Sequence, residues 1–186
     1  MQRIQTQAFV SEKTYIPGDV IADLRTDHAG EVGAVCIYRG VLQLTRDPGV
    51  RAFAKRHLET ESEHLQQIEA WLPTAEYSRL LPLWRVAGWL TGALPALCGP
   101  RAVYATVQAV ETFVDQHYAE QVQHLESNAN LQALRQTLLR CQTDELAHRD
   151  EAAAALGPGA PGAMLRLWCW LVSCGSRAAV AVCRHV

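Results

Sequence analysis

The chain has 186 residues, a formal net charge of −2 and 49% hydrophobic residues, of which few are aromatic. This length favours one domain, residues 1–186, that can bury a sizeable core, and the small net charge gives no sign of a nucleic-acid partner. The six cysteines are scattered and form no Cys-x-x-Cys pair or disulfide framework. This pattern is typical of a reducing compartment.

The first part of the chain predicts two helices. Residues 1–17 form a polar N-terminal extension without the apolar core of an export signal. The Pro-Gly-Asp sequence at 17–19 indicates the start of a helix that runs to about residue 45. Asp47 and Pro48 are typical of a helix cap and a first helical residue, so we expect a second helix from there to about residue 72.

The second part predicts two more long helices and a last apolar one. Pro100 indicates the start of a third helix that ends near residues 126–130. The fourth is expected from about Leu131 to Leu156, where the Gly- and Pro-rich residues 157–162 end it. No strand-like alternation is found. The sequence therefore predicts an all-α protein, a four-helix core with two additional apolar helices.

Two segments, residues 80–99 and 163–183, are far more apolar than the rest. The first is broken by two prolines and Arg85, and the second contains Arg166 and Arg177. A spanning helix needs about 20 apolar residues with few charges, whereas cations among Trp and Leu favour a helix on a bilayer surface. We expect both segments to face a membrane, with two core helices of a soluble bundle as the alternative. The candidate surface residues are Trp84, Trp89, Leu90, Leu94, Leu97, Leu167, Trp168, Trp170 and Leu171.

Two glutamates interrupt apolar stripes that have helical spacing. Glu31 lies between Leu24 and Val35, and Glu111 lies between Val107 and Val114. A buried carboxylate must be paired, protonated or bound to a metal. For either glutamate alone, a misjudged helix face is the usual explanation.

Two Glu-x-x-His pairs, Glu61 with His64 and Glu145 with His148, lie on the apolar faces of the second and fourth predicted helices. Residues three apart lie about 60° apart around the helix axis and about 4.5 Å along it, so both side chains can bind one ion. With the two single glutamates, this is the ligand set of di-iron and di-manganese carboxylate bundles. The order of residues repeats in the two halves, which predicts that each half gives one metal its histidine.

The sequence around these residues resembles the demethoxyubiquinone hydroxylases of ubiquinone biosynthesis. The likeness covers about residues 18–186. It is carried by LRTDHAGEVGAVCIYRG at 24–40, ESEHL at 61–65, LPLWRVAGWLTGALPAL at 81–97, AVETFVDQHYAEQ at 109–121, DELAHRDEA at 144–152 and CGSRAAVAV at 174–182.

The resemblance implies a ferritin-like fold with two iron ions that hydroxylates the ring of a polyprenylated methoxy-methyl-benzoquinone with O2 and with reducing equivalents from NADH. It implies His117 and Tyr118 as candidate catalytic residues that support the ligands or take part in redox chemistry. Thr60, Thr112 and Ala147 depart from common residues of the family, but none is a ligand position. The ligand positions that it implies are Glu31, Glu61, His64, Glu111, Glu145 and His148.

Four neighbouring polar residues keep more than one interpretation. Asp27 and Asp144 could fix the imidazole tautomers of the ligands or could be ordinary surface acids. His57 lies one turn before Glu61 and is either close to the metals or a core histidine with a backbone partner. His28 belongs to the family signature, but its role cannot be deduced.

A polyprenyl quinone stays in the bilayer, so its enzyme must open towards a membrane lipid surface. With no export signal, this predicts a peripheral protein on the cytoplasmic face of a bacterial inner membrane. No Gly-x-Gly-x-x-Gly motif is present, so the route of the electrons stays open. A homo-oligomer and other proteins of ubiquinone biosynthesis are partners that the sequence also leaves open.

The ligand set permits other functions. A rubrerythrin- or ferritin-like peroxidase or iron-handling protein could use the same six residues, although neither explains the two apolar segments. A non-enzymatic bundle that binds lipid or a partner would leave six polar side chains in a core without metal, which is unfavourable.

Overall fold

A computed structural model of the chain describes residues 15–186, so most of the predicted N-terminal extension lies outside the described residues. The long helices are α1 (Gly18–Leu44), α2 (Pro48–Glu69), α3 (Leu81–Cys98), α4 (Pro100–His124), α5 (Gln132–Leu156) and α6 (Ala163–Cys183). Two short 3₁₀ turns, η1 (Thr74–Glu76) and η2 (Ala129–Leu131), lie between them. Every regular element of residues 15–186 is helical, which confirms the predicted all-α, ferritin-like class.

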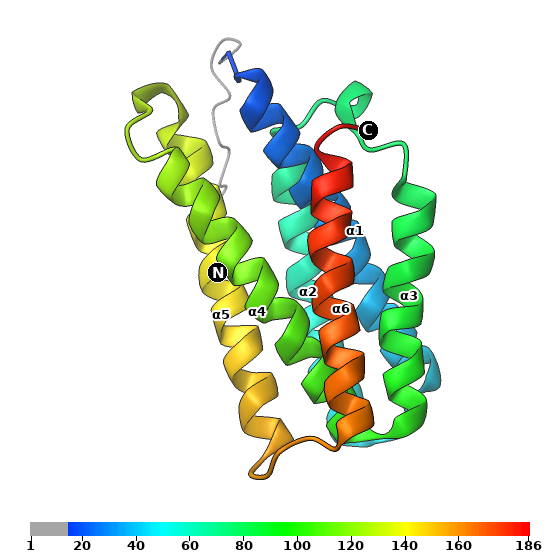
Figure 1. Ribbon diagram of the computed structural model, residues 1–186. Coiled ribbons are helices and arrows are strands. Elements are labelled where there is room, and N and C mark those ends of the chain that lie inside the picture. The colour runs from blue at the N-terminus through cyan, green and yellow to red at the C-terminus, as the bar shows by residue number, and fades with distance from the viewer. Residues whose placement is uncertain (1–14) are drawn as a thin grey trace, which may run out of the picture.

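The helices α1, α2, α4 and α5 form the bundle, and α3 and α6 cover one side of it (Figure 1). Helix α3 packs along α1, and α6 lies mainly on α4 and also contacts α1. Two apolar clusters fill the bundle. The first contains Leu24, Ile68 and Leu134, and the second contains Tyr38, Phe53 and Val107. The polar site described below lies between these clusters along the helices.

Local signals explain the helix starts. The Asp47 side chain caps α2 by accepting a hydrogen bond from the Val50 N–H at 2.8 Å. Pro48 and Pro100 occupy first turns, where the missing N–H would have no partner within the helix. Helix α2 ends at Glu69 rather than near residue 72, and the chain turns before Pro73.

The expectation of a broken segment at 80–99 is wrong, because α3 is one continuous helix. Pro82 lies in its first turn, and Pro95 lies close to its end, so only the last part of the hydrogen-bond ladder is disturbed. Glycines let α3 approach α1 closely. A Cβ on Gly92 would lie 1.9 Å from the Ile37 carbonyl oxygen, and one on Gly88 would lie 2.5 Å from that of Gly33.

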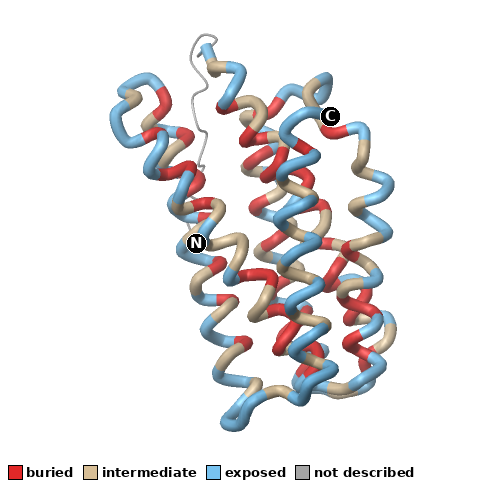
Figure 2. The backbone as a smooth tube through the Cα atoms, in the orientation of Figure 1, coloured by how far each residue is buried: buried red, intermediate tan, exposed pale blue. Residues whose placement is uncertain are grey.

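The outer faces of α3 and α6 are largely exposed (Figure 2), and they carry many large apolar side chains. On α6, Trp170 and Leu167 keep 61% and 51% of their surface exposed. Of the helices in residues 15–186, α6 alone has the length and composition that could cross a membrane, a test that core helices of soluble proteins also pass. The exposed large apolar residues of the two helices are Leu83, Val86, Leu90, Leu94, Leu97, Met164, Leu167, Trp170, Leu171 and Val182.

Not every tryptophan proposed for that surface lies on it. Trp168 is partly buried, and its Nε1 donates to the Thr106 hydroxyl of α4 at 2.9 Å. Trp89 donates to Gln43 of α1 at 2.7 Å, and Trp84 is also partly buried. The assignment of Trp168 to the outer face is therefore wrong, because its indole packs inward between α6 and α4.

Candidate metal centre

The structure brings the six predicted ligands together in the middle of the bundle. Glu31 comes from α1 and Glu111 from α4, while α2 and α5 each contribute a Glu-x-x-His pair. All six side chains are buried. The three-residue spacing places each Glu and His on the same side of its helix, as the sequence predicted.

The six residues form two overlapping groups, each able to hold one metal ion. One group contains Glu31 and His64, and the other contains Glu111 and His148. Glu61 and Glu145 belong to both groups. Within each group the ligand atoms lie within 4.8 Å of one another. The two shared carboxylates are thus the ones that could bridge two ions, an assignment that the sequence left open.

Both imidazoles face the centre with Nδ1. His64 Nδ1 lies 3.1 Å from Oε1 of Glu145 and 3.7 Å from Oε2 of Glu61. His148 Nδ1 lies 3.1 Å from Oε1 of Glu61 and 3.4 Å from Oε2 of Glu145. Each histidine therefore approaches both a carboxylate of its own helix pair and one from the opposite pair.

Several ligand atoms have no hydrogen-bond partner among the described residues. They are Oε2 of Glu31, Oε1 of Glu61, Oε2 of Glu145 and Nδ1 of His148. A buried polar atom without a partner is costly, and two metal ions, one in each group, would satisfy these four atoms. Carboxylate oxygens with two imidazole nitrogens favour iron or manganese over the softer metals. The residues present therefore fit a pair of such ions.

In the absence of a metal ion, burial and the neighbouring charged groups shift the pKa values of these carboxylates and imidazoles. Burial raises the pKa of Glu31 and of Glu111 well above the ordinary value, and the neighbouring carboxylates raise it further. Burial also disfavours the charged form of Glu61, but its close contacts with the imidazoles of His148 and His64 outweigh this and lower its pKa to about 2. Burial opposes the imidazolium of His148, but its close contacts with the carboxylates of Glu145 and Glu61 raise its pKa to about 9.

We expect the metal-free protein to lose stability as the pH rises from about 6.5 to about 9. The folded pKa of His148 is about 9, above the ordinary 6.5, so its imidazolium stabilises the fold fully below pH 6.5. That contribution disappears as the pH rises through 9. The raised pKa values of Glu31 and Glu111 also lower the stability as the pH rises. These carboxyl groups ionise readily in the unfolded chain, whereas in the folded protein burial opposes their ionisation.

The measurement is the Tm of metal-free protein across this range, with an expected fall of about 5 °C or more. Saturating Mn²⁺ should abolish the fall, since a metal binds more tightly as its ligands lose protons. A metal-free Tm that stays constant or rises over this pH range would contradict the expectation.

Two tyrosines support the ligands of opposite halves. The Tyr118 hydroxyl of α4 donates to Oε1 of Glu31, and the Tyr38 hydroxyl of α1 donates to Oε1 of Glu111 at 2.9 Å. Each tyrosine lies seven residues after the glutamate of its own helix and bonds the glutamate of the other. Tyr118 was a sequence candidate, whereas Tyr38 was not. The repeated Glu-x₆-Tyr spacing is the signal that could have revealed it.

Asp144 and Asp27, the two acids that could fix the tautomers of the ligand histidines, contact different histidines. Nε2 of His64 lies 3.1 Å from Oδ2 of Asp144, a contact that leaves the Nδ1 lone pair free to bind a metal. Asp27 contacts no ligand histidine. Its Oδ1 lies 3.1 Å from Nε2 of His117 and accepts a hydrogen bond from Gln121 at 2.6 Å. Of the two interpretations left open for Asp27, the structure supports neither, because Asp27 is buried and contacts His117 instead.

The remaining histidines lie outside the two metal groups. His117 contacts the Thr26 hydroxyl at 2.9 Å. His57 is buried, and its partners are side chains rather than the backbone. His28 is buried against the Tyr77 ring, with centroids 3.8 Å apart.

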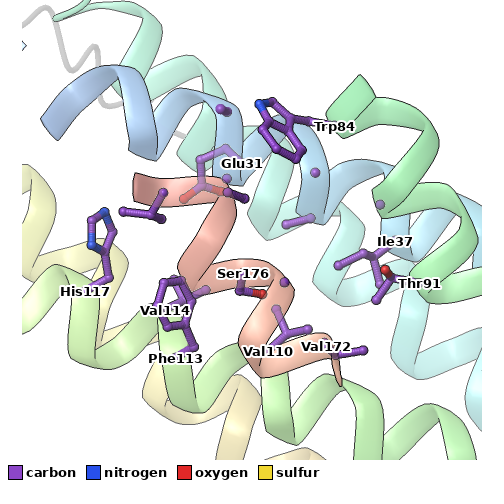
Figure 3. Close-up of a pocket in the computed structure, with 18 of the residues that line it drawn as sticks. Glu31, Ile37, Trp84, Thr91, Val110, Phe113, Val114, His117, Val172 and Ser176 are labelled. Atoms are coloured by element: carbon purple, nitrogen blue, oxygen red, sulfur yellow. The ribbon is translucent and has the colours of Figure 1, made fainter. Parts of the chain in front are cut away.

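A cavity of about 370 Å³ lies between α1, α3, α4 and α6 and reaches the metal centre (Figure 3). Its inner wall includes Glu31 and Glu111 and the two shared carboxylates, and His117 and Thr26 form a polar patch. The rest is mostly apolar. The close-up shows lining residues from all four helices, among them Ile37 of α1, Thr91 of α3, Val110 of α4 and Val172 of α6. The additional helices thus close a space beside the metal centre that a bare four-helix bundle would leave open.

The fold and the paired ligand groups define the class of four-helix-bundle carboxylate proteins that bind two metal ions. Comparison with known proteins narrows this class. Residues 20–183 match the family described as "Ubiquinone biosynthesis protein COQ7". The chain belongs to this family.

Curated relatives agree with the match. A Caenorhabditis elegans protein named NADPH-dependent 3-demethoxyubiquinone 3-hydroxylase, mitochondrial, is 30% identical over 168 residues, which cover 88% of each chain. A Rhodospirillum rubrum protein named 3-demethoxyubiquinol 3-hydroxylase is 34% identical over 78% of this chain and 74% of its own. A Homo sapiens relative with the same name as the C. elegans protein is 32% identical over 68% of this chain and 60% of its own.

Proposed function

We propose that this protein is a di-iron monooxygenase that hydroxylates a polyprenylated demethoxy-quinone, 2-polyprenyl-3-methyl-6-methoxy-1,4-benzoquinone, with O2 in ubiquinone biosynthesis. The observation that carries the proposal is the apolar cavity whose inner end is formed by the four glutamates of the metal groups. The names of the relatives, 3-demethoxyubiquinone and 3-demethoxyubiquinol 3-hydroxylases, support the choice of substrate and reaction.

In this proposal Glu31, Glu61, His64, Glu111, Glu145 and His148 hold two iron ions, which when bound supply O2 activation. Glu61 and Glu145 would be ligands of either ion, because each belongs to both ligand groups. Tyr118 and Tyr38 keep Glu31 and Glu111 aimed inward by hydrogen bonds. Asp144 holds the proton of His64 on Nε2.

The cavity orients the quinone and excludes water. Its apolar walls between α3 and α6 match the prenyl tail, and its polar patch matches the ring oxygens. His117, held by Asp27 and Thr26, is the residue that we assign to a ring oxygen, where Nδ1 can donate a proton while Nε2 faces Asp27. Tyr118 lies next to it in the chain and bonds Glu31, so the same helix turn contacts both substrate and ligand.

The source of electrons is a reduced nicotinamide dinucleotide. The resemblance indicated NADH, while several mitochondrial relatives are named NADPH-dependent. We propose no dedicated dinucleotide site, since the chain contains no Gly-x-Gly-x-x-Gly sequence. A homo-oligomer or other proteins of ubiquinone biosynthesis are the further partners proposed.

The outer apolar faces of α3 and α6 support peripheral attachment to a membrane, on the cytoplasmic face if the source is a bacterium. Because the cavity lies beneath these two helices, attachment through them would place its opening next to the bilayer that holds the substrate.

We expect Trp170→Glu and Leu167→Glu each to weaken liposome binding. Both side chains are more than half exposed, and burying such a side chain in lipid contributes about 1.5–3 kcal/mol, or roughly a tenfold to hundredfold change in affinity. The measurement is sedimentation with liposomes, with iron content as a check on folding. Leu139→Glu, on the exposed side of α5, is the matched control and should bind like the unchanged protein. Equal binding by all three variants would contradict the role of α6.

The test of the function uses iron-loaded protein in liposomes with the demethoxy-quinone, a reduced nicotinamide and isotope-labelled O2. Mass spectrometry should find one labelled oxygen on the quinone ring. Iron oxidation with an unchanged quinone, both with NADH and with NADPH, would favour the alternative of a rubrerythrin- or ferritin-like peroxidase or iron-handling protein.

A further inference from the structure

A chain of hydrogen bonds leads from the protein surface to Glu111. The Glu151 carboxylate on α5 is 44% exposed, and its Oε2 lies 3.0 Å from Nε2 of His57. Nδ1 of His57 lies 3.2 Å from the Tyr38 hydroxyl, which donates to Oε1 of Glu111 at 2.9 Å. We propose that Glu151, His57 and Tyr38 form a proton relay between bulk water and the candidate ligand Glu111. This inference rests on the function proposed above.

Each link of the chain can both accept and donate a proton. A proton from water that reaches Glu151 passes to Nε2 of His57. The Nδ1 proton of His57 passes to the Tyr38 oxygen, and the Tyr38 hydroxyl gives its own proton to Glu111. The two middle groups each gain one proton and lose one, so the net result is one proton moved from water to Glu111.

The packing holds the middle of the chain in one orientation. His57 and Tyr38 are 2% and 1% exposed, so water has little direct access to them. The His57 ring lies between those of Phe53 and His148, with centroids 4.0 and 3.9 Å away. These contacts keep its two nitrogens directed at Glu151 and Tyr38.

Tyr118, the tyrosine of the opposite half, lacks such a chain. Among the described residues, the Tyr118 hydroxyl has Glu31 as its one hydrogen-bond partner. The position equivalent to His57, four residues before the second Glu-x-x-His, is the buried Cys141, which makes no hydrogen bond with Tyr118. Of the two tyrosines, Tyr38 alone has an imidazole that links it to an exposed acid, and the exposed Asp144 contacts the candidate ligand His64 directly.

The proposed reaction consumes a proton that must come from water. One oxygen atom of O2 enters the ring and the other leaves as water, which consumes two electrons and two protons. The nicotinamide supplies both electrons and one proton as hydride, and water supplies the other proton. The cavity is mostly apolar and would be filled by the quinone, and Glu151, His57 and Tyr38 are not part of its lining. Substrate and proton thus enter from different sides.

Proton release during metal loading reports on the relay without any turnover, because a metal displaces protons from its ligands. Metal-free protein is mixed in a stopped-flow instrument with Mn²⁺ and a pH indicator in weak buffer, and the final metal content is measured. We expect Tyr38→Phe and His57→Gln to slow proton release about 10- to 100-fold with the same final metal content. Gln keeps a donor and an acceptor but cannot exchange tautomers, which separates a relay from a structural role.

Two comparisons complete the experiment. Glu151→Gln should slow proton release. Glu126→Gln, the same substitution at another exposed glutamate, should not. His57→Ala should be slow and should be accelerated by added imidazole, a result that a purely structural role would not give. If Tyr38→Phe fails to take up metal, the imidazole comparison decides, and no acceleration overturns the relay. Unchanged release in Tyr38→Phe and His57→Gln overturns it as well, while failure of the unchanged protein to bind metal overturns the proposed function itself.

Discussion

Replacing Glu61 by alanine should remove both metal ions, whereas replacing Glu31 should weaken one. Glu61 belongs to both ligand groups, and Glu31 belongs to one. Glu61→Ala takes a charged ligand from each site and leaves the imidazoles of His64 and His148 without one of their carboxylate partners. We expect bound metal to fall from two ions per chain to nearly none, and quinone hydroxylation to fall by roughly a thousandfold or more.

Metal content by elemental analysis and product by mass spectrometry check this result. Glu145→Ala should behave like Glu61→Ala, because it is the other shared carboxylate. Glu120→Gln, an exposed change on α4, is the control for the loss of a negative charge. Two ions retained in Glu61→Ala would show that this carboxylate does not bridge.

Filling the cavity from α6 should block the quinone without disturbing the metals. Gly175 lines the cavity, and a Cβ added there meets no atom within 4 Å, so a larger side chain can enter the space without a backbone clash. We expect Gly175→Trp to lower kcat/KM for the quinone about 10- to 100-fold. The indole would occupy space that the quinone needs, and crowding of this kind costs about 1–3 kcal/mol. Its iron content and Tm should stay close to those of the unchanged protein.

Gly175→Ala is the matched control and should keep nearly full activity. Cys174→Trp adds similar bulk to the next residue, which is exposed and not part of the lining, and should also remain active. If Gly175→Trp hydroxylates the quinone normally, the substrate does not use this cavity, although the metal assignment would still stand.

Local chemistry explains why the helices could be predicted so closely. Asp47, Pro48 and Pro100 act within one helix turn, so the starts of α2 and α4 are decided by neighbouring residues. The breaking effect of prolines depends on where in the helix they fall. Pro82 and Pro95 lie near the two ends of α3, and the sequence alone did not indicate that the helix would continue between them.

Helical spacing predicts which side chains face the centre of the bundle, but not which partners they contact there. A stripe of residues predicts that Glu31 and Tyr38 face inward, but it does not predict which glutamate a tyrosine will reach. Tyr38 bonds Glu111, 73 residues away in the chain, and Tyr118 bonds Glu31, 87 residues away. Trp168 was misassigned for a similar reason, because its partner Thr106 belongs to another helix.

The sequence by itself determined the class of the protein, its helices and the six candidate ligands, because capping, helical spacing and the Glu-x-x-His pattern depend on residues close together in the chain. The tertiary structure alone decided that Glu61 and Glu145 are shared, that the tyrosines cross between halves, and that α3 and α6 enclose a cavity ending at the glutamates. These features depend on how helices far apart in sequence pack against one another. That packing is set by close contacts such as Gly92 against Ile37, which no local pattern records.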